Sequence, residues 1–517
     1  SIQIGPQRLR SPPDSAQKEW TREMNPVEGN GNVVTDPLVG RTFGGGVEDV
    51  IKSARIAPAP ATLEEARNAP GRREQIEAIT ARIEREGIKY VFFQQVSVTG
   101  RVMGKGVVST FFPQVAAKGY QLVYGATANL FTDRYGNYIG FGPEESELAA
   151  IADLDTFEVL PWDPRVARVY CDCYDTETGD LLDADPRQNL KRIAHDFEQE
   201  LGLQFLIGIE PEMMWLRKPQ PGEAPVGVTQ PYCYHIHQFE ELRPVLMDVV
   251  EYGQALGLDM SYGDHEDAPG QLELNFRFDR PVRTADNITT YRQVCAAVGR
   301  KHDLLPTFMP KPFTGVSANG HHHHFTLCDT EGNNVFHDPD GPAQLSETAR
   351  FFLGGLLEHF HALMCIGNPT VNSYCRMWDT GFWAPIYKNW GWQNRTTTVR
   401  VASGGRFEYR GVDSSSNPYL TTAALLVAGL DGIRNKIDPG EPQQGNTYDL
   451  LQAGAEIEKV PDSLGAALEA LRADELVQSA LPGRLYKVFD WYKRDEWERY
   501  LAAVTDWERD EYLEVLP

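Results

Sequence analysis

Phe205-Leu-Ile-Gly-Ile-Glu210-Pro-Glu212 is an apolar stretch that ends in two carboxylates, which is the pattern of a buried β-strand that reaches a polar site. Residues i and i+2 of a strand lie on one face, so we expect Glu210 and Glu212 side by side. Two carboxylates on one face repel each other unless a cation neutralises them. The stretch predicts a β-rich core with a cation site on one strand; a solvated strand end is the alternative for this motif alone.

Two later stretches add ligands of the same kind. Asp264-His-Glu266 precedes a Pro-Gly turn and a strand in which Glu273 lies on the face opposite Leu272 and Leu274. Gly320-His-His-His-His324-Phe-Thr-Leu lies in the middle of the chain, and as a strand it places His322, His324 and Thr326 on one face. Carboxylate oxygens with an imidazole suit Mg²⁺ or Mn²⁺ better than zinc or copper.

Arginines cluster downstream of these carboxylates. Five of them fall within 35 residues: Arg376, Arg395, Arg400, Arg406 and Arg410. In Arg406-Phe-Glu408-Tyr-Arg410 the charged side chains alternate with aromatic ones and share one strand face. An exposed strand whose charged side chains pair with one another is the alternative explanation of this pattern. Guanidinium groups bind carboxylate and phosphate bidentately, so the pattern favours an anion clamp beside a divalent metal. The sequence has no Walker loop, so metal ligands together with phosphate-binding arginines indicate ATP chemistry outside the P-loop class.

Composition excludes several classes of protein. The 517 residues carry a net charge of −24, so a nucleic-acid partner, which needs a basic face, is not expected. The seven cysteines form no C-x-x-C pair, which predicts a reduced, cytoplasmic compartment. The longest apolar runs are too short to span a bilayer, so no membrane partner is expected.

The chain divides into three predicted parts. Residues 1–70 are rich in glycine, proline and polar residues and indicate an N-terminal arm, with a flexible linker at 40–46. Residues 71–177 predict a small α+β domain with strands at 90–98, 102–109 and 167–174 and a helix at 111–118. Residues 178–517 predict the catalytic domain, with helices that begin at Pro186 and span 349–364 and 420–435.

Several motifs, in order, resemble those of the glutamine synthetase family from about residue 72 to the C-terminus. They are Glu210-Pro-Glu212, Glu266-x-Ala-Pro-Gly-Gln-x-Glu273, Phe308-Met-Pro-Lys-Pro312, Gly320-x-His322-x-His324, Asn368-Pro-Thr-x-Asn-Ser-Tyr-x-Arg376, Asn394-Arg395, Arg406-x-Glu408-x-Arg410 and Asn417-Pro-Tyr-Leu. In character the chain is most similar to the γ-glutamylanilide and γ-glutamylalkylamide synthetases of that family.

The resemblance implies an α+β fold, with an N-terminal β-grasp domain followed by a catalytic domain whose antiparallel sheet forms a funnel surrounded by helices. It implies active sites between neighbouring subunits of a ring, usually a homododecamer. ATP would be the co-substrate, with two or more Mg²⁺ or Mn²⁺ ions per active site.

The resemblance also implies roles for individual residues. Glu212, Glu266 and Glu273 would hold one metal ion, and Glu210, His322 and Glu408 the other. Phe278, His324, Thr326, Arg395, Arg400 and Arg406 would bind the nucleotide. Arg376, Arg410 and Glu212 would bind glutamate, and Arg395, Glu266 and His324 would be catalytic.

Two departures from the family concern the amine. An ammonium-using synthetase has an acid in a small-domain loop and a second acid on a flap before Ala-Pro, but here Tyr124 and Trp383 stand at these positions. Ammonium is a cation at pH 7 that needs carboxylates, whereas an aromatic amine is neutral. We therefore expect an aromatic-walled amine pocket, formed by Tyr124, Thr127, Trp378, Phe382 and Trp383.

The resulting hypothesis is an ATP-dependent ligase that joins the γ-carboxylate of L-glutamate to an aromatic amine such as aniline through γ-glutamyl phosphate. Such an enzyme would serve amine catabolism, for example aniline degradation. A protonated alkylamine such as isopropylamine, held by cation–π contact with Trp383 or by Asp379, is one alternative. An ordinary ammonium-using synthetase is a second. A non-catalytic ring-forming relative is a third, but it would be expected to lack metal ligands, and all six are present.

Overall fold

The computed structural model of the protein describes residues 34–36, 41–43, 50, 59–128, 131–145, 147–220, 223–378 and 383–514. The chain forms two compact units, Ser1–Gly46 and Val47–Pro517. In the first unit, β1 (Val34–Asp36) pairs antiparallel with β2 (Arg41–Phe43). The linker predicted at 40–46 is therefore wrong at Arg41–Phe43, where the backbone forms a strand ladder.

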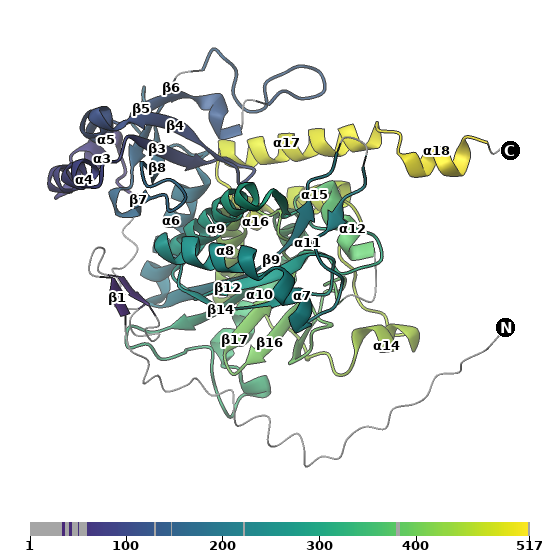
Figure 1. The fold of residues 1–517 in the computed structure, drawn as a ribbon. Helices are drawn as coiled ribbons and strands as arrows, with labels where there is room; N and C mark the ends of the chain where they lie inside the picture. Colours follow the sequence, from purple (N-terminus) through teal and green to yellow (C-terminus); the bar gives the residue numbers. More distant parts are fainter. Residues whose placement is uncertain are drawn as a thin grey trace. The chain divides into compact units, whose positions relative to one another are not determined.

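The second unit begins with a six-stranded mixed sheet in the order β4-β3-β8-β6-β5, with β7 paired to β8. Helices α4 (Arg72–Glu86) and α5 (Phe112–Lys118) lie beside this sheet (Figure 1). The strands are β3 (Tyr90–Val96), β4 (Val102–Val108), β5 (Tyr120–Val123), β6 (Glu147–Ala152), β7 (Glu158–Val159) and β8 (Val166–Asp175). β3 runs parallel to β8 and antiparallel to β4, as in the β-grasp arrangement that was expected.

The folded part of the second unit includes residues that the sequence assigned to the N-terminal arm. Helix α3 (Leu63–Arg67) begins with a capping box in which Thr62 and Glu65 satisfy each other's backbone N–H groups. Leu63 and Ala66 of α3 are buried against Ile151 of β6. Burial of this short apolar face orders a segment whose polar composition predicted an arm.

A nine-stranded sheet forms the core of the larger domain, in the order β11-β12-β9-β14-β17-β16-β15, with β10 and β13 paired to β9. All its pairs are antiparallel except β15–β16. The strands are β9 (Gln204–Arg217), β10 (Val226–Gly227), β11 (Met260–His265), β12 (Gln271–Phe276), β13 (Leu304–Thr307), β14 (His321–Cys328), β15 (Trp390–Trp392), β16 (Val399–Ser403) and β17 (Arg406–Tyr409). The long strand β9 holds the sheet together because β10, β12, β13 and β14 all pair with it.

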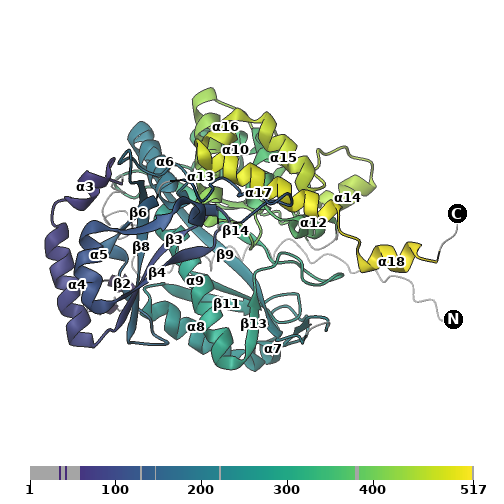
Figure 2. The same cartoon turned by 90° about the horizontal axis from the view of Figure 1, so that it is seen from above.

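Helices surround this sheet (Figure 2). The helices of this domain are α6 (Pro186–Leu201), α7 (Ile236–Glu241), α8 (Arg243–Ala255), α9 (Pro281–His302), α10 (Glu347–Glu358), α11 (Phe360–Gly367), α12 (Val371–Trp378), α13 (Pro418–Asn435), α14 (Thr447–Gln452), α15 (Leu464–Ala473), α16 (Glu475–Ser479), α17 (Arg484–Leu501) and α18 (Asp506–Tyr512), of which α18 projects away from the sheet. The single helix predicted over 349–364 is instead α10 and α11, separated at His359, whose ring nitrogens bond Asp474 and Asp431. Among the described residues, no helix is long and apolar enough to cross a membrane.

A buried ion cluster joins the two domains of the second unit. Arg187 of α6 is 2% exposed, and its guanidinium lies 2.8 Å from both Asp153 and Asp172 of the small domain. The same guanidinium lies 2.9 Å from Asp286 of α9. Lys191, one turn further along α6, also pairs with Asp153 and Asp172, at 2.9 and 2.7 Å. The cluster fixes α6 between the small sheet and the large one.

Arg187→Ala is expected to lower the free energy of unfolding by about 3–5 kcal/mol, because it leaves the buried Asp286 without its cation and leaves Asp153 and Asp172 with Lys191 alone. Arg192→Ala is the matched control on the same helix, because Arg192 is 48% exposed and bonds only neighbours on its own helix, Asp196 and the Asn189 amide oxygen. We expect it to change the free energy of unfolding by less than about 0.5 kcal/mol. Urea denaturation of the two variants measures the free energy of unfolding of each. Equally small losses in both variants would contradict the claim that the Arg187 cluster fixes α6 between the two sheets.

Candidate active site

Charged and imidazole side chains gather on one face of the nine-stranded sheet. Residues directly opposite each other on paired strands share a face, so the strand register shows which side chains meet. The cross-strand partners here are Asp264 with Glu273, Glu273 with Glu212, Glu210 with His322, His324 with Glu408, and Glu408 with Arg400. These partners form one continuous polar stripe across strands that are far apart in the sequence.

One half of the stripe contains carboxylates that already have imidazole or guanidinium partners. Nε2 of His324 lies 2.8 Å from Glu210, and one ligand atom each of Glu210, His324 and Glu408 lie within 4.8 Å of one another. Nδ1 of His322 lies 3.3 Å from Glu210, 3.6 Å from Glu408 and 3.7 Å from Glu212. Burial alone would raise the pKa of Glu210, but the two histidines outweigh it and hold that pKa well below its usual range.

The other half of the stripe is an uncompensated acidic cluster. Burial, reinforced by Glu212 and Asp264, raises the pKa of Glu266 to about 8. Burial, reinforced by Glu210 and Glu212, raises the pKa of Asp264 to about 6 and that of Glu273 well above its usual range. Among the residues that the structure describes, no lysine or arginine lies within ion-pair distance of Glu266 or Glu273. In their charged forms these carboxylates repel one another unless a cation from outside the chain binds between them.

The donor set fits hard divalent ions. Carboxylate oxygens, the ligands that Mg²⁺ and Mn²⁺ prefer, dominate it. Without a bound ion the crowded carboxylates are destabilised in their charged form, and the pKa values of Glu266 and Glu273 are therefore raised. Glu212, Glu266 and Glu273 would hold one ion, and Glu210, Glu408 and a histidine the other. The structure brings both His322 and His324 to Glu210, so either imidazole is placed to serve.

Glu408 connects the metal ligands to the arginines. Its carboxylate pairs with Arg410 and lies 2.6 Å from Nη1 of Arg400. Burial alone would raise its pKa, but Arg410, His324 and His322 lower that pKa to about 2. The buried Arg376 donates to the carbonyls of Val412 and Arg410, so both predicted glutamate-binding arginines lie at this end of the sheet.

The predicted nucleotide-binding residues lie around the outer part of the stripe. Phe278 packs over Gly208, the cross-strand partner of His324, where an added Cβ would come within 3.3 Å of Phe278. Arg395 and Arg406 are both exposed. The Thr326 hydroxyl lies 2.7 Å from the Asn334 amide oxygen and the Gly405 carbonyl, so its only proton is engaged within the chain.

The predicted amine-pocket residues fall into two separate groups. Tyr124 and Thr127 lie in the 3₁₀ turn η2 (Tyr124–Ala128) of the small domain, and both are buried. The Tyr124 hydroxyl donates to Asp175, and its ring lies against Phe141 and under the Arg484 guanidinium of α17. Tyr124 therefore packs inside its own chain instead of presenting its ring to a pocket.

The flap forms the second group. Trp378 is exposed, and its indole N–H donates to the Asp462 carbonyl at 3.0 Å. Trp383 is 54% exposed, and its carbonyl accepts a hydrogen bond from Arg410 at 3.4 Å. Its φ of +56° is unusual for a bulky residue, so the backbone there is held by its surroundings. Phe382 lies outside the described residues. Within the described part of one chain, no hydrogen bond or ring contact joins η2 to Trp378 or Trp383.

Several residues that support the ligands stand in the motifs quoted above but had no role assigned to them from the sequence. Asp264 joins the acidic cluster, and its spacing of two residues from Glu266 was the available signal. Glu212 is fixed by the backbone N–H of Gly320 at 2.7 Å and by the Gln271 amide at 3.2 Å. A Cβ at Gly320 would come within 2.5 Å of the His322 ring, so this position requires glycine.

The protein-family model described as "Glutamine synthetase, catalytic domain" matches residues 183–512. The chain belongs to the glutamine synthetase family. Glutamine synthetase of Pyrococcus abyssi is 40% identical over 391 residues, which cover 72% of this chain and 87% of that protein. The Staphylococcus aureus glutamine synthetase is 37% identical over 386 residues, which cover 72% of this chain and 85% of that protein.

Solved structures extend the likeness to the small domain. A GmaS/ADP complex, in its conformation 1, superposes with a TM-score of 0.76 at 31% identity and covers 84% of this chain and 99% of that one. Apo GmaS gives a TM-score of 0.77 at the same identity and coverage. Together with the family match, this makes the protein an ATP-dependent glutamate–amine ligase of the glutamine synthetase type. Enzymes of this family use ATP and divalent metal ions.

Mg²⁺ binding is expected to release protons, because a pKa of about 8 leaves most of the Glu266 carboxyl protonated at neutral pH. Raising the pH removes that proton in advance, so affinity for Mg²⁺ should rise from about pH 6 to pH 8. Calorimetry of Mg²⁺ binding at pH 7, in two buffers of different ionisation enthalpy, measures the protons released. Glu266→Gln should reduce both the release and the pH slope, while the exposed Glu65→Gln should change neither. A pH-independent affinity would contradict the acidic cluster.

Proposed function

We propose that the protein joins the γ-carboxylate of L-glutamate to an aromatic amine such as aniline, consuming ATP and giving a γ-glutamylamide, ADP and phosphate. One observation carries the proposal. The carboxylates, the histidines and Arg400 lie on one sheet face, and Arg376 of α12 lies at its end, while Tyr124 and Trp383 occupy the positions where ammonium-handling acids are expected.

The residues of this chain divide the work of the first step. Arg376 and Arg410, at the buried end of the stripe, hold the carboxylates of glutamate. Arg395, Arg400, Arg406 and His324 face the phosphates of ATP, and Phe278 supports the adenine. Two divalent ions, Mg²⁺ or Mn²⁺, would offset the charge that develops as the γ-phosphoryl group moves from ATP to the γ-carboxylate.

The choice of amine follows from the acids that are missing. The Tyr124 hydroxyl donates to the carboxylate of Asp175, which also accepts the backbone N–H groups of Glu177 and Thr178. This carboxylate is therefore not free to bind ammonium or to take its proton. Trp383 offers an exposed indole at the end of the flap, tied through its carbonyl to Arg410 beside the glutamate site. A neutral amine with a flat apolar body suits this surface.

The burial of Tyr124 refines the proposal. Tyr124 is 1% exposed, so it offers no surface to an amine, and its role is that it replaces an acid. Trp383 supplies the aromatic surface. An alkylamine such as isopropylamine, attracted as a cation to the Trp383 ring, is the second candidate substrate. Ammonium is the third, and the likeness to glutamine synthetases is what favours it.

We further propose that the enzyme works as a ring, in keeping with the homododecamer implied by the family, with each active site completed by a neighbouring chain. The support is that η2 and Trp383 belong to one predicted pocket but make no contact with each other in the described part of one chain. Sedimentation of the active enzyme should give a species several times heavier than the 58.0 kDa chain. Full activity in a monomer would contradict the ring.

The test of substrate choice compares kcat/KM for aniline, isopropylamine and ammonium on the unmodified enzyme. We expect aniline to exceed ammonium by about tenfold or more, because stacking contributes about 0.5–1.5 kcal/mol per ring pair and ammonium gains no carboxylate. A higher kcat/KM for ammonium would show that the protein is a glutamine synthetase with an unusual flap.

Trp383→Glu is the sharper variant, because Trp383 is exposed and its replacement removes no core packing. It should raise kcat/KM for ammonium and lower it for aniline, whereas Trp383→Phe, the matched control, should keep the preference for aniline. Tyr124→Asp is less suitable, since it would place a second carboxylate beside Asp175 and leave a cavity against Phe141. Unchanged substrate preference in Trp383→Glu would remove the flap from the specificity argument.

A further inference from the structure

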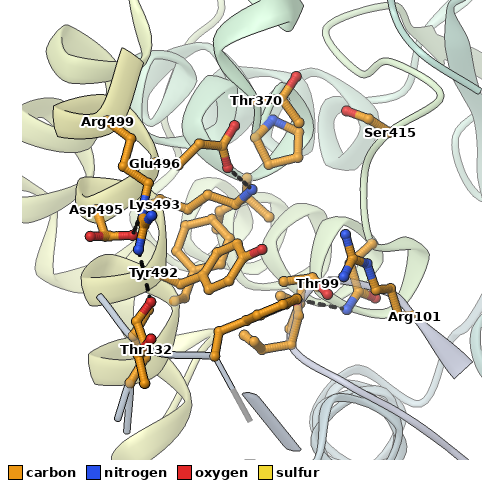
Figure 3. A pocket seen from close by; sticks show the side chains of 18 residues that line it. Thr99, Arg101, Thr132, Thr370, Ser415, Tyr492, Lys493, Asp495, Glu496 and Arg499 are labelled. Atoms are coloured by element: carbon orange, nitrogen blue, oxygen red, sulfur yellow. Dashed lines mark hydrogen bonds and ion pairs between the residues drawn. The ribbon is translucent and has the colours of Figure 1, made fainter. Parts of the chain in front are cut away.

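A cavity of about 830 Å³ lies where the small domain meets the large one, and none of the predicted active-site residues lines it (Figure 3). Its walls come from three places: the turn between β3 and β4 with the 131–139 segment, the loops before α12 and α13, and helix α17. Its volume lies in the range of ordinary small-molecule sites, about 300–1,000 Å³. The Asn417 amide, which donates to the carbonyls of Ser97 and Val98 at 3.2 Å, fixes the junction beside it.

Of the three cationic side chains that line the cavity, two form ion pairs with carboxylates. Lys493 pairs with Glu496 at 2.9 Å, and Arg499 pairs with Asp495 at 2.6 Å. Arg101 lines the opposite side of the cavity (Figure 3), and within the described ranges no carboxylate lies at ion-pair distance from it. The lining therefore favours one negative charge on an occupant, placed at Arg101.

Apolar and aromatic surface surrounds that cation. The Arg101 guanidinium lies 5.2 Å from the centre of the Phe131 ring, and Phe131 lies 5.5 Å from Tyr492 in a tilted ring pair. Ile366, Leu420 and other aliphatic side chains complete the wall. Such a surface suits the ring of a small aromatic molecule, because aromatic pairs add to the free energy gained by burying apolar area.

The large-domain walls of the cavity are connected to the active site. Ser415 lines the cavity, and its hydroxyl donates to the buried Asp413 at 2.6 Å. Its neighbour Ser414 lies with its hydroxyl 2.7 Å from the Gly320 carbonyl and also bonds the carbonyl of Glu212. The charge of Asp413 also acts on Arg376, so an occupant that moves Ser415 acts on the loop behind both the metal and the glutamate ligands.

A second connection runs through α12. Thr370 lines the cavity just before this helix, and its hydroxyl lies 2.8 Å from that of Ser373 in the first turn. Arg376 follows on the same helix. Two separate walls of the cavity thus lead to the arginine that is predicted to bind glutamate.

We propose that this cavity is a regulatory site for a small aromatic monocarboxylate. Its carboxylate pairs with Arg101, its ring packs against Phe131 and Tyr492, and binding changes the apparent affinity for glutamate through Ser415 and Thr370. The binding claim is independent of which amine the enzyme uses, and the kinetic claim requires only glutamate–amine ligase activity.

Phenylacetate is the probe, titrated by calorimetry into the assembled full-length enzyme with glutamate and ADP present to fill the active site. We expect a Kd of about 0.1–1 mM and a change of at least about threefold in the KM for glutamate, with little change in kcat. Phenylethylamine, which carries the opposite charge on a similar body, should not bind.

Arg101→Gln should weaken phenylacetate binding at least tenfold and abolish the shift in KM, while its kcat and KM without phenylacetate stay as in the unmodified enzyme. Arg101→Lys should retain part of the binding, and Arg73→Gln, an exposed change on α4, should retain all of it. Three outcomes would overturn the proposal: no binding of phenylacetate up to about 10 mM, equal binding in Arg101→Gln, or complete displacement by glutamate alone, beyond the roughly threefold effect that reciprocal coupling requires. The amine comparison fails or succeeds independently of this titration.

Discussion

Repulsion among carboxylates on one face of a sheet is the constraint on which the rest of this structure depends. Glu212, Glu273 and Asp264 are cross-strand neighbours, and Glu266 directly follows the strand that carries Asp264. Burial makes their charges more costly, which is why the pKa values of Glu266 and Asp264 rise to about 8 and 6. A fold that only needed stability would not keep such a cluster. The large sheet is better understood as a frame that forces these groups together until a cation binds.

The frame has to be stiff for this to work. Strand β9 carries two of the ligands and pairs with strands on both sides, so register alone fixes which side chains meet. Glycine at position 320 lets the His322 ring lie beside Glu212, and the Arg187 cluster holds α6 between the two sheets. Glu408 then joins metal ligands to anion holders through Arg410, which in turn reaches the flap at Trp383. The residues predicted to bind metal, glutamate and amine are thus connected in one chain of contacts.

Much of this could be predicted from the sequence, because alternation along a strand determines which side chains share a face. The strands around Glu210, His322 and Glu408 followed from that rule, and the arginines followed from their alternation with aromatic residues. Tertiary environment decided the rest. The burial of Tyr124 depends on Asp175 and on Arg484, which lies 360 residues away, and no local pattern indicates such a contact. The order of α3 and the break at His359 likewise depend on partners remote in sequence.

We propose that the sheet face holds two divalent ions through separate sets of carboxylates. The most direct measurement is a titration of the protein with Mn²⁺, in which free Mn²⁺ is followed by electron paramagnetic resonance. We expect two bound ions per chain, with one lost in Glu408→Gln and the other lost in Glu273→Gln. A single bound ion in the unmodified enzyme, or two bound ions in both variants, would contradict it.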